Sequence, residues 1–142
     1  MSIQSQHLVI GTWELPIQGE EDIVLVRRKV RAIAQARKLD SFAVAALTTA
    51  ASELTRNAWV HAGGGSAILE ELADGTRYGI RATFIDHGPG ISDLERALKG
   101  GFSTTRTMGL GLSGSRRLVD TFDIQTCPQG GTRVCIEKWG RG

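Results

Sequence analysis

The chain has few cysteines, and the two that it has are badly placed for a disulfide. Cys127 and Cys135 are the only cysteines among 142 residues. They flank the turn sequence PQGG, and in a hairpin centred on that turn they would not lie opposite each other. Because unpaired cysteines persist in a reducing compartment, we expect a cytoplasmic protein.

Long apolar segments, strong charge and zinc-binding histidine patterns are also missing. No apolar run approaches the roughly 20 residues that a membrane helix needs, and residues 1–15 lack the charged start and long apolar core of a signal peptide. The formal net charge of +2 is too small to indicate nucleic-acid binding by itself. The histidines His7, His61 and His87 show no zinc spacing. We therefore expect neither a membrane nor a nucleic-acid partner.

What the chain does contain is enough apolar sequence for one domain. Hydrophobic residues make up 41% of the chain, and its length suits one ordinary core. We find no internal repeat, linker or second domain, so residues 1–142 are expected to form a single domain. Some strands are joined as hairpins, and helices come early and between strands. This order predicts an α+β fold, an α/β sandwich in which helices cover one face of a mixed, mostly antiparallel sheet.

Local signals place the expected elements. Acidic residues precede basic ones in a helix at 20–39, which suits the helix dipole. Ser41 is expected to cap a second helix, and Asp74-Gly75 indicates a hairpin turn. The other expected elements are strands at 7–15 (ending near Pro16), 66–72, 78–86, 123–127 and 131–139, helices at 42–62, 92–98 and 109–122, and a glycine- and hydroxyl-rich loop at 99–108.

The first helix contains a basic cluster that has two interpretations. Arg27, Arg28, Lys29 and Arg31 follow one another closely. The simpler interpretation, which we prefer at this point, is a solvated helix face. The sharper one is a patch that binds an acidic protein partner.

A polar trio marks one face of the second helix. Glu53, Asn57 and His61 are spaced four residues apart and therefore point to the same side, among largely apolar or small neighbours. A carboxylate and an amide on so apolar a helix need partners. Glu53 and Asn57 either bond each other or nearby groups, or Asn57 supplies an oxygen to Mg²⁺ while Glu53 acts as a base. The spacing alone leaves both interpretations open.

A second candidate site follows the strand at 78–86. It ends in Asp86, and the next residues include Gly88 and Gly90. An ionised carboxylate accepts hydrogen bonds only, such as one from the exocyclic amine of adenine. The glycines then allow a flat ring or a phosphate to approach the backbone. A simple turn explains this short motif equally well.

The segment GLGLSG matches G-x-G-x-x-G but fails the tests for known dinucleotide sites. A Rossmann site needs a buried strand directly before it, and GGFSTTRTM is no such strand. A Walker loop is excluded because no G-x-x-x-x-G-K-[ST] occurs. What remains is a glycine-rich loop entering a helix N-terminus, which favours an anion such as a polyphosphate. Ser103, Thr104, Thr105 and Arg106 would add donors from the loop.

The combination of these motifs is far more specific than any one of them. In order, the chain has E-x-x-x-N-A-x-x-H-A, D-x-G-x-G, a hydroxyl-rich loop, G-x-G before a helix, and GGT opening a late strand. This resembles the GHKL ATPase superfamily, which shares the Bergerat nucleotide-binding fold, over roughly residues 50–139. Within it, the chain is similar to small bacterial serine/threonine kinases that regulate sigma factors. The segments SELTRN, DHGPGI, GGFSTT and GLGL are most similar to the RsbT-type switch kinases of the stressosome.

The resemblance implies ATP and Mg²⁺ as ligands and assigns roles to residues. Glu53 corresponds to the base that acts on a protein hydroxyl, Asn57 to the asparagine that holds Mg²⁺, and Asp86 to the aspartate that bonds adenine. His61 is expected to serve packing or helix-face hydrogen bonding. The remaining nucleotide-binding residues implied are Gly88 and Gly90 at the backbone, Thr104, Thr105 and Arg106 in the lid, Gly109, Leu110, Gly111 and Leu112 at the phosphate-binding helix start, and Thr132 near adenine.

Two functions from different classes follow from the resemblance. In the first, the chain is a kinase that phosphorylates a serine or threonine of a STAS-domain antagonist or scaffold protein and so becomes free to activate a downstream target such as a phosphatase. In the second, it is an anti-sigma factor that sequesters a sigma subunit and uses ATP for partner exchange. A degenerate module that docks partners without turnover ranks last, because all the motif residues are present. The ATP module takes up nearly all 142 residues, so we expect a separate acceptor protein, and a homodimer is compatible with the sequence.

Overall fold

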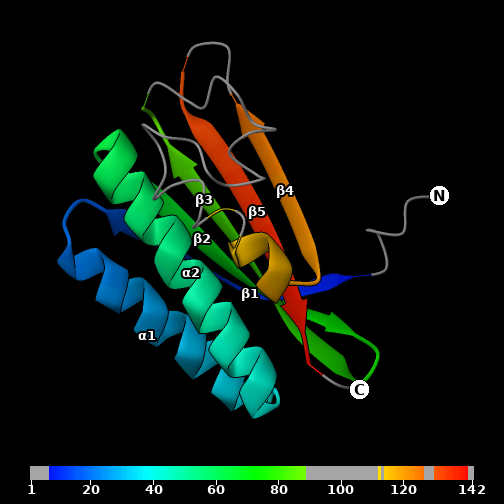
Figure 1. Ribbon diagram of the computed structural model, residues 1–142. Helices are drawn as coiled ribbons and strands as arrows, with labels where there is room; N and C mark the ends of the chain where they lie inside the picture. The colour runs from blue at the N-terminus through cyan, green and yellow to red at the C-terminus, as the bar shows by residue number, and fades with distance from the viewer. Residues whose placement is uncertain (1–6, 89–111, 113, 127–129, 141–142) are drawn as a thin grey trace.

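The computed structural model describes residues 7–88, 112, 114–126 and 130–140. Within this part of the chain, the strands form a five-stranded sheet in the order β1-β2-β3-β5-β4, and every pairing is antiparallel. The two long helices lie together on one face of the sheet (Figure 1), which confirms the expected α+β fold. The elements are β1 (Leu8–Ile17), α1 (Glu21–Ala36), α2 (Ser41–Ala62), β2 (Gly65–Asp74), β3 (Arg77–Asp86), β4 (Thr121–Thr126) and β5 (Thr132–Trp139).

The core lies between the helices and the sheet. Val26 and Val30 of α1 are fully buried, and they lie four residues apart on the inner side of that helix. Leu47 and Leu54 of α2 are also buried, seven residues apart on one face. On the sheet, buried residues alternate with less buried ones, and the inward-facing set includes Leu69, Ile80, Ala82, Phe84, Val134 and Ile136.

The helix α2 is long and well capped. Asp40 has an extended backbone, and its side chain accepts a hydrogen bond of 3.2 Å from the backbone N–H of Ala43. The expectation of Ser41 as the cap is therefore wrong by one residue, because Ser41 already lies inside the helix. At the other end, Gly63 has φ 76° and donates its N–H to the carbonyl of Trp59.

Two strand boundaries differ from the sequence prediction. β1 continues through Pro16, which pairs with Ser66. A proline is tolerated there because β1 is an edge strand and its missing N–H removes no central hydrogen bond. The helix expected at 109–122 gives way to β4 at Thr121, because Phe122 and Ile124 alternate toward the core and pair with β5.

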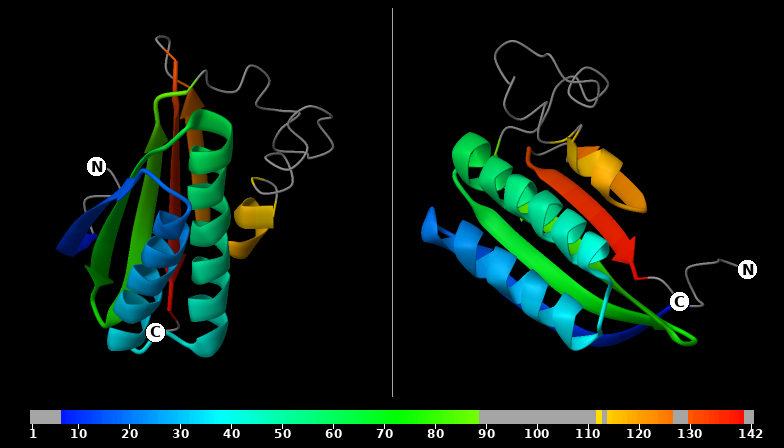
Figure 2. Two further views of the ribbon diagram at one scale, coloured as in Figure 1. Left: turned by 90° about the vertical axis from the view of Figure 1, so that its left-hand side faces the viewer. Right: turned by 60° about the horizontal axis from the view of Figure 1, so that its bottom comes forward.

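The helical residues 114–118 complete the helix side of the fold. In Figures 1 and 2, α2 lies between α1 and this short helical segment. One flank of α2 is therefore covered by α1, and the other faces the segment that follows the glycine-rich motif. Glu53 and Asn57 belong to this central helix.

Candidate functional site

Three strands meet at the candidate site. Asp86 is the last residue of β3 and pairs with Gly65 of β2 on one side and Thr132 of β5 on the other. Its Oδ1 accepts hydrogen bonds from the backbone N–H groups of Gly88 at 3.1 Å and Thr132 at 3.2 Å. Among the described residues, both hydrogen bonds of this carboxylate go to Oδ1. The fold therefore fixes the carboxylate and leaves Oδ2 to accept from a ligand.

Burial raises the pKa of the Asp86 carboxyl above its usual value. The two backbone hydrogen bonds oppose this effect but do not outweigh it. A half-buried carboxylate that retains acceptor capacity suits a neutral donor such as an exocyclic amine.

Glycines allow the segments around Asp86 to come close together. Gly131 has φ +98°, and a Cβ there would lie 2.4 Å from the backbone carbonyl oxygen of Asp86. A Cβ on Gly88 would lie 2.6 Å from the Cβ of Ala62, so this glycine lets the loop after β3 pack on the end of α2. The structure thus shows close approach of Gly88 to α2, and the expected approach of a ligand to its backbone stays a prediction. In the sequence, residues 130–131 stand out only as part of the GGT motif, although a glycine pair directly before a strand is a signal for such a close approach.

Asn57 is the most unusual polar residue of α2. It is only 5% exposed, and neither its Oδ1 nor its Nδ2 has a hydrogen-bond partner among the described residues. An unsatisfied buried amide costs about 1–3 kcal/mol. Such a group is explained when a ligand completes its bonding. An amide oxygen is a suitable ligand for Mg²⁺, so this residue fits the expected Mg²⁺·ATP.

The two other polar residues on this face of α2 are also partly buried. Glu53, one turn earlier, is partly buried, so it remains reachable for a substrate hydroxyl. His61, one turn later, has a buried Nε2 without a partner among the described residues. The three polar side chains that the spacing placed on one face thus belong to one flank of α2.

Other expected site residues stand as follows. Thr132 is 4% exposed and lies beside Asp86, as the resemblance implied. Leu112 is 2% exposed and packs in the hydrophobic core, so its expected contact with nucleotide stays a prediction. The residues Gly90, Thr104, Thr105, Arg106, Gly109, Leu110 and Gly111 lie outside the described part of the chain, and their roles stay predictions.

One buried polar residue was missed by the sequence analysis. Ser115, in the helical segment 114–118, is 1% exposed, and its Oγ has no partner within the described ranges. A lone serine in a helix gives no sequence signal. Together with Asn57 it shows that unsatisfied polar atoms occur on both α2 and the segment beside it.

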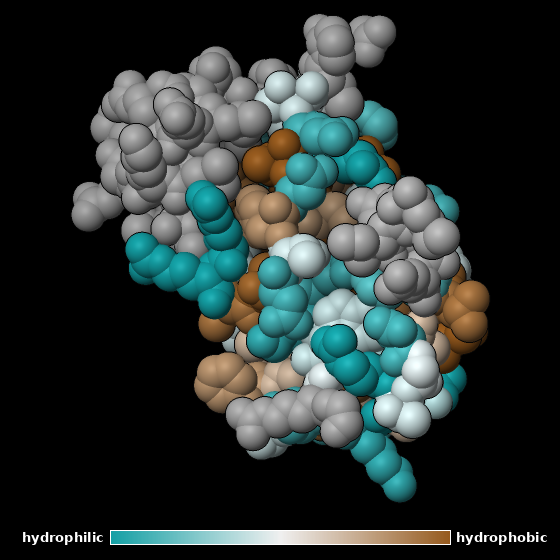
Figure 3. All heavy atoms as spheres, turned by 90° about the vertical axis from the view of Figure 1, so that its right-hand side faces the viewer, coloured by the Kyte–Doolittle hydropathy of each residue, from teal (hydrophilic) through white to brown (hydrophobic). Residues whose placement is uncertain are grey.

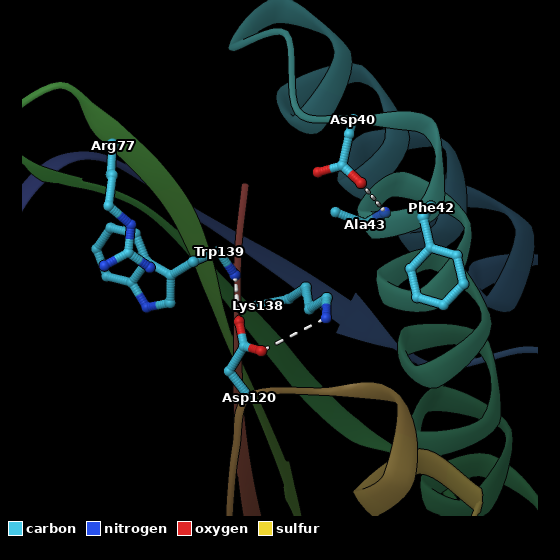
Figure 4. Close-up of a pocket in the computed structure, with 7 residues that line it drawn as sticks. All are labelled: Asp40, Phe42, Ala43, Arg77, Asp120, Lys138 and Trp139. Carbon is cyan, nitrogen blue, oxygen red and sulfur yellow. Dashed lines mark hydrogen bonds and ion pairs between the residues drawn. The ribbon is translucent and has the colours of Figure 1, made fainter. Parts of the chain in front are cut away.

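Two cavities lie away from this site. One, of about 340 Å³, opens between the start of α2 and the far ends of β3 and β5 (Figure 4). Its charges are already engaged: Lys138 Nζ lies 3.4 Å from Asp120 Oδ1, and the Arg77 guanidinium stacks 4.9 Å from the Trp139 ring. Arg77 and Trp139 are at the opposite strand ends from Asp86 and Thr132, so this cavity is separate from the candidate site.

The second cavity, of about 970 Å³, lies over the sheet face that carries no helix. There Arg81 bridges Glu137 at 2.9 Å and Glu70 at 3.4 Å. Figure 3 shows hydrophilic residues prevailing over the centre of the side that lies to the right in Figure 1.

No helix in the described part of the chain is long and apolar enough to cross a membrane.

The fold and this site define a class of protein. The chain belongs to the family of histidine kinase-like ATPase domains, whose model matches residues 18–138. It is 38% identical over 125 residues to the serine/threonine-protein kinase RsbT of Bacillus subtilis (strain 168). The aligned region covers 88% of this chain and 94% of that protein. The expectation of an RsbT-type protein serine/threonine kinase is thereby confirmed.

Solved structures show the same fold. The RsbU and RsbW domains of a Mycobacterium tuberculosis protein match with a TM-score of 0.64 and 19% identity, over 93% of this chain and 33% of that one. This chain thus spans about a third of that structure's chain. The SiaB–SiaC complex of Pseudomonas aeruginosa matches with a TM-score of 0.53 and 14% identity, over 92% of this chain and 90% of that one.

Proposed function

We propose that this chain transfers the γ-phosphoryl group of Mg²⁺·ATP to a serine or threonine of a STAS-domain partner in the cytoplasm. The phosphorylated partner then releases the kinase, which binds a downstream phosphatase or sigma-factor regulator. The observation that supports this most strongly is the buried amide of Asn57, which has no hydrogen-bond partner among the described residues and lies at the same end of the fold as the fixed carboxylate of Asp86. We take residues 1–142 to act as one ATP-binding module.

The resemblance implies the roles of the site residues, and the geometry of the described ones is compatible with those roles. Asp86 Oδ2 accepts from the adenine amine while Thr132 N and Gly88 N hold Oδ1. Asn57 Oδ1 would hold Mg²⁺, which neutralises phosphate charge during transfer. Glu53, partly buried one turn before Asn57, orients the acceptor hydroxyl and takes its proton. The glycine-rich motif at 109–111, which lies outside the described residues, would accommodate the phosphates.

The test has two stages. ATP binding is titrated with and without Mg²⁺, and binding that strengthens with Mg²⁺ is expected. Labelled ATP is then incubated with the kinase and purified STAS-domain proteins, beside a pull-down with sigma subunits. Label on a serine or threonine of the STAS partner supports the kinase function. A stable sigma complex without transfer would favour the anti-sigma alternative, and absence of ATP binding would reject both.

A further inference from the structure

A run of positive charge extends from the middle of α1 to the two residues that follow the helix. Residues 23–38 contain six of the 17 basic residues and none of the 15 acidic ones. The rest of the chain therefore holds 11 basic and 15 acidic residues. The net charge of +2 therefore combines a basic stretch at 23–38 with a remainder in which acidic residues outnumber basic ones.

Three arginines form what we call the α1 basic face: Arg27, Arg28 and Arg31. All three are exposed. None of them forms an ion pair with a carboxylate of the described residues, in contrast to Arg37, which bonds Glu71. Arg37 and Arg81 are each held by a carboxylate, whereas the three neighbouring arginines of the α1 basic face have no such partner in the described part of the chain.

The face also has an apolar part. Leu25 is 48% exposed and lies three residues before Arg28, so the two are on one side of the helix. Lys29, at the border, is held with its Nζ 4.7 Å from the Trp13 ring centroid. The inward side of α1 is buried in the core, so these groups are directed outward.

Clustered like charges have a cost in an isolated helix. Arg27 and Arg31 are four residues apart, and Arg28 and Arg31 are three apart; such like-charge pairs destabilise a helix. Folding alone does not require three neighbouring arginines that lie beside an exposed leucine and have no carboxylate partner among the described residues. A partner that supplies acidic groups and an apolar contact would explain the arrangement.

We propose that the α1 basic face is the docking surface for an acidic protein partner, one that presents carboxylates around an apolar side chain. This rests on the proposed function, in which the kinase exchanges protein partners. A long polyanion or an anionic membrane fits less well, because the remaining 11 basic and 15 acidic residues would repel it. The basic face is also only one helix wide, and an exposed leucine lies at its edge.

The location of the face separates docking from catalysis. α2 lies between α1 and the helical segment 114–118 that follows the glycine-rich motif (Figures 1 and 2). A partner on the outer side of α1 therefore does not need to displace nucleotide from the end of β3. The surface provides affinity for the partner, while Glu53 and Asn57 deal with the acceptor hydroxyl and the phosphates.

The experiment uses the full chain and a defined probe. The probe is an amphipathic helical peptide of about 18 residues with leucines on one face, flanked by glutamates. The tested variant is Arg28→Glu/Arg31→Glu. The control is Arg133→Glu, which reverses one exposed arginine away from α1, on β5. Affinities are measured by fluorescence anisotropy at low and high salt, and amide chemical shifts locate the bound peptide.

We expect the double reversal to weaken peptide binding about tenfold or more, with the control close to the unmodified chain. A peptide with lysines in place of the glutamates should prefer the double variant. Equal binding by the double variant and the control would overturn the proposal. So would tighter binding of a DNA duplex or of phosphatidylserine vesicles than of the acidic peptide.

ATP binding, measured on the same samples, keeps the two proposals apart. The double variant should bind ATP as the unmodified chain does. If the chain binds no ATP but the peptide still shifts α1 resonances, the kinase proposal fails and the docking surface stands. If ATP binds and STAS transfer occurs but the peptide is insensitive to the reversal, the docking surface fails alone.

Discussion

Asp86 and Thr132 are 46 residues apart in the sequence, yet the backbone N–H of Thr132 donates a 3.2 Å hydrogen bond to Asp86 Oδ1. The second bond to the same oxygen comes from Gly88. Two donors from two different segments therefore decide which carboxylate oxygen faces a ligand. The proposed contact with adenine should therefore be sensitive to a change of a single atom of this side chain.

Asp86→Asn should abolish the preference for adenine without unfolding the protein. The two N–H donors keep an oxygen at the Oδ1 position, so the new NH₂ group takes the place of Oδ2 and meets the adenine amine donor to donor. We expect the Kd for ATP to rise about tenfold to a hundredfold, and the ratio of ATP to GTP affinity to fall, because guanine offers a carbonyl there. Calorimetry with both nucleotides measures this. An unchanged ratio would mean that Asp86 does not contact the base.

The raised pKa of Asp86 predicts a pH effect on both stability and binding. Burial raises this pKa in the folded chain above its unfolded value, so the folded state binds more protons between the two values. Stability without nucleotide should therefore fall as pH rises through that interval. ATP binding needs the ionised form and should weaken as pH falls through the raised pKa. Urea titrations and ATP titrations over the acidic range check this, and Asp86→Asn should lose both trends.

Glu53→Gln should separate binding from phosphoryl transfer. The amide is similar in shape to the carboxylate but is not a base, so transfer to a serine or threonine should fall by about a hundredfold or more. The Kd for Mg²⁺·ATP should change little, since the proposed contacts to the nucleotide are made by Asn57 and Asp86. Single-turnover transfer of labelled phosphate gives the first value and calorimetry the second. Full transfer by Glu53→Gln would remove this residue from the role of base.

The sequence predicted the α+β fold, one helix-covered face and the main elements, because apolar periodicity and turn residues are local signals. It also predicted that Asn57 and Asp86 belong together, but only through the resemblance, since nothing local joins α2 to the end of β3. The Asp40 cap was missed because two adjacent residues were both good caps. The unsatisfied state of Asn57 depends on neighbours from distant segments, which a single sequence does not reveal.

Asn57→Leu should make the protein more stable and inactive at the same time. Leucine has a similar shape and removes a buried amide that has no partner within the described ranges, so the free energy of unfolding should rise by about 1 kcal/mol or more. Mg²⁺-dependent ATP binding should be lost. The matched control is Thr55→Val, on the same helix, because the Thr55 hydroxyl is buried but bonded to the Ala51 carbonyl at 2.7 Å. That change should destabilise by about 1 kcal/mol and keep ATP binding. Destabilisation by both variants would show that the Asn57 amide is satisfied in the protein.

Gly131→Ala should damage the adenine site, whereas Gly75→Ala should affect stability alone. Both glycines have positive φ, +98° for Gly131 and +63° for Gly75, so both alanines are strained. Only at Gly131 would the new Cβ meet another segment, the Asp86 carbonyl oxygen at 2.4 Å, while Gly75 has open space. Relieving that clash moves the start of β5 and pulls the Thr132 N–H away from Asp86. The Kd for ATP should rise about tenfold in Gly131→Ala and remain unchanged in Gly75→Ala. Thermal unfolding of both variants controls for the shared strain, and equal ATP affinity in the two would show that the contact between β5 and Asp86 does not shape the site.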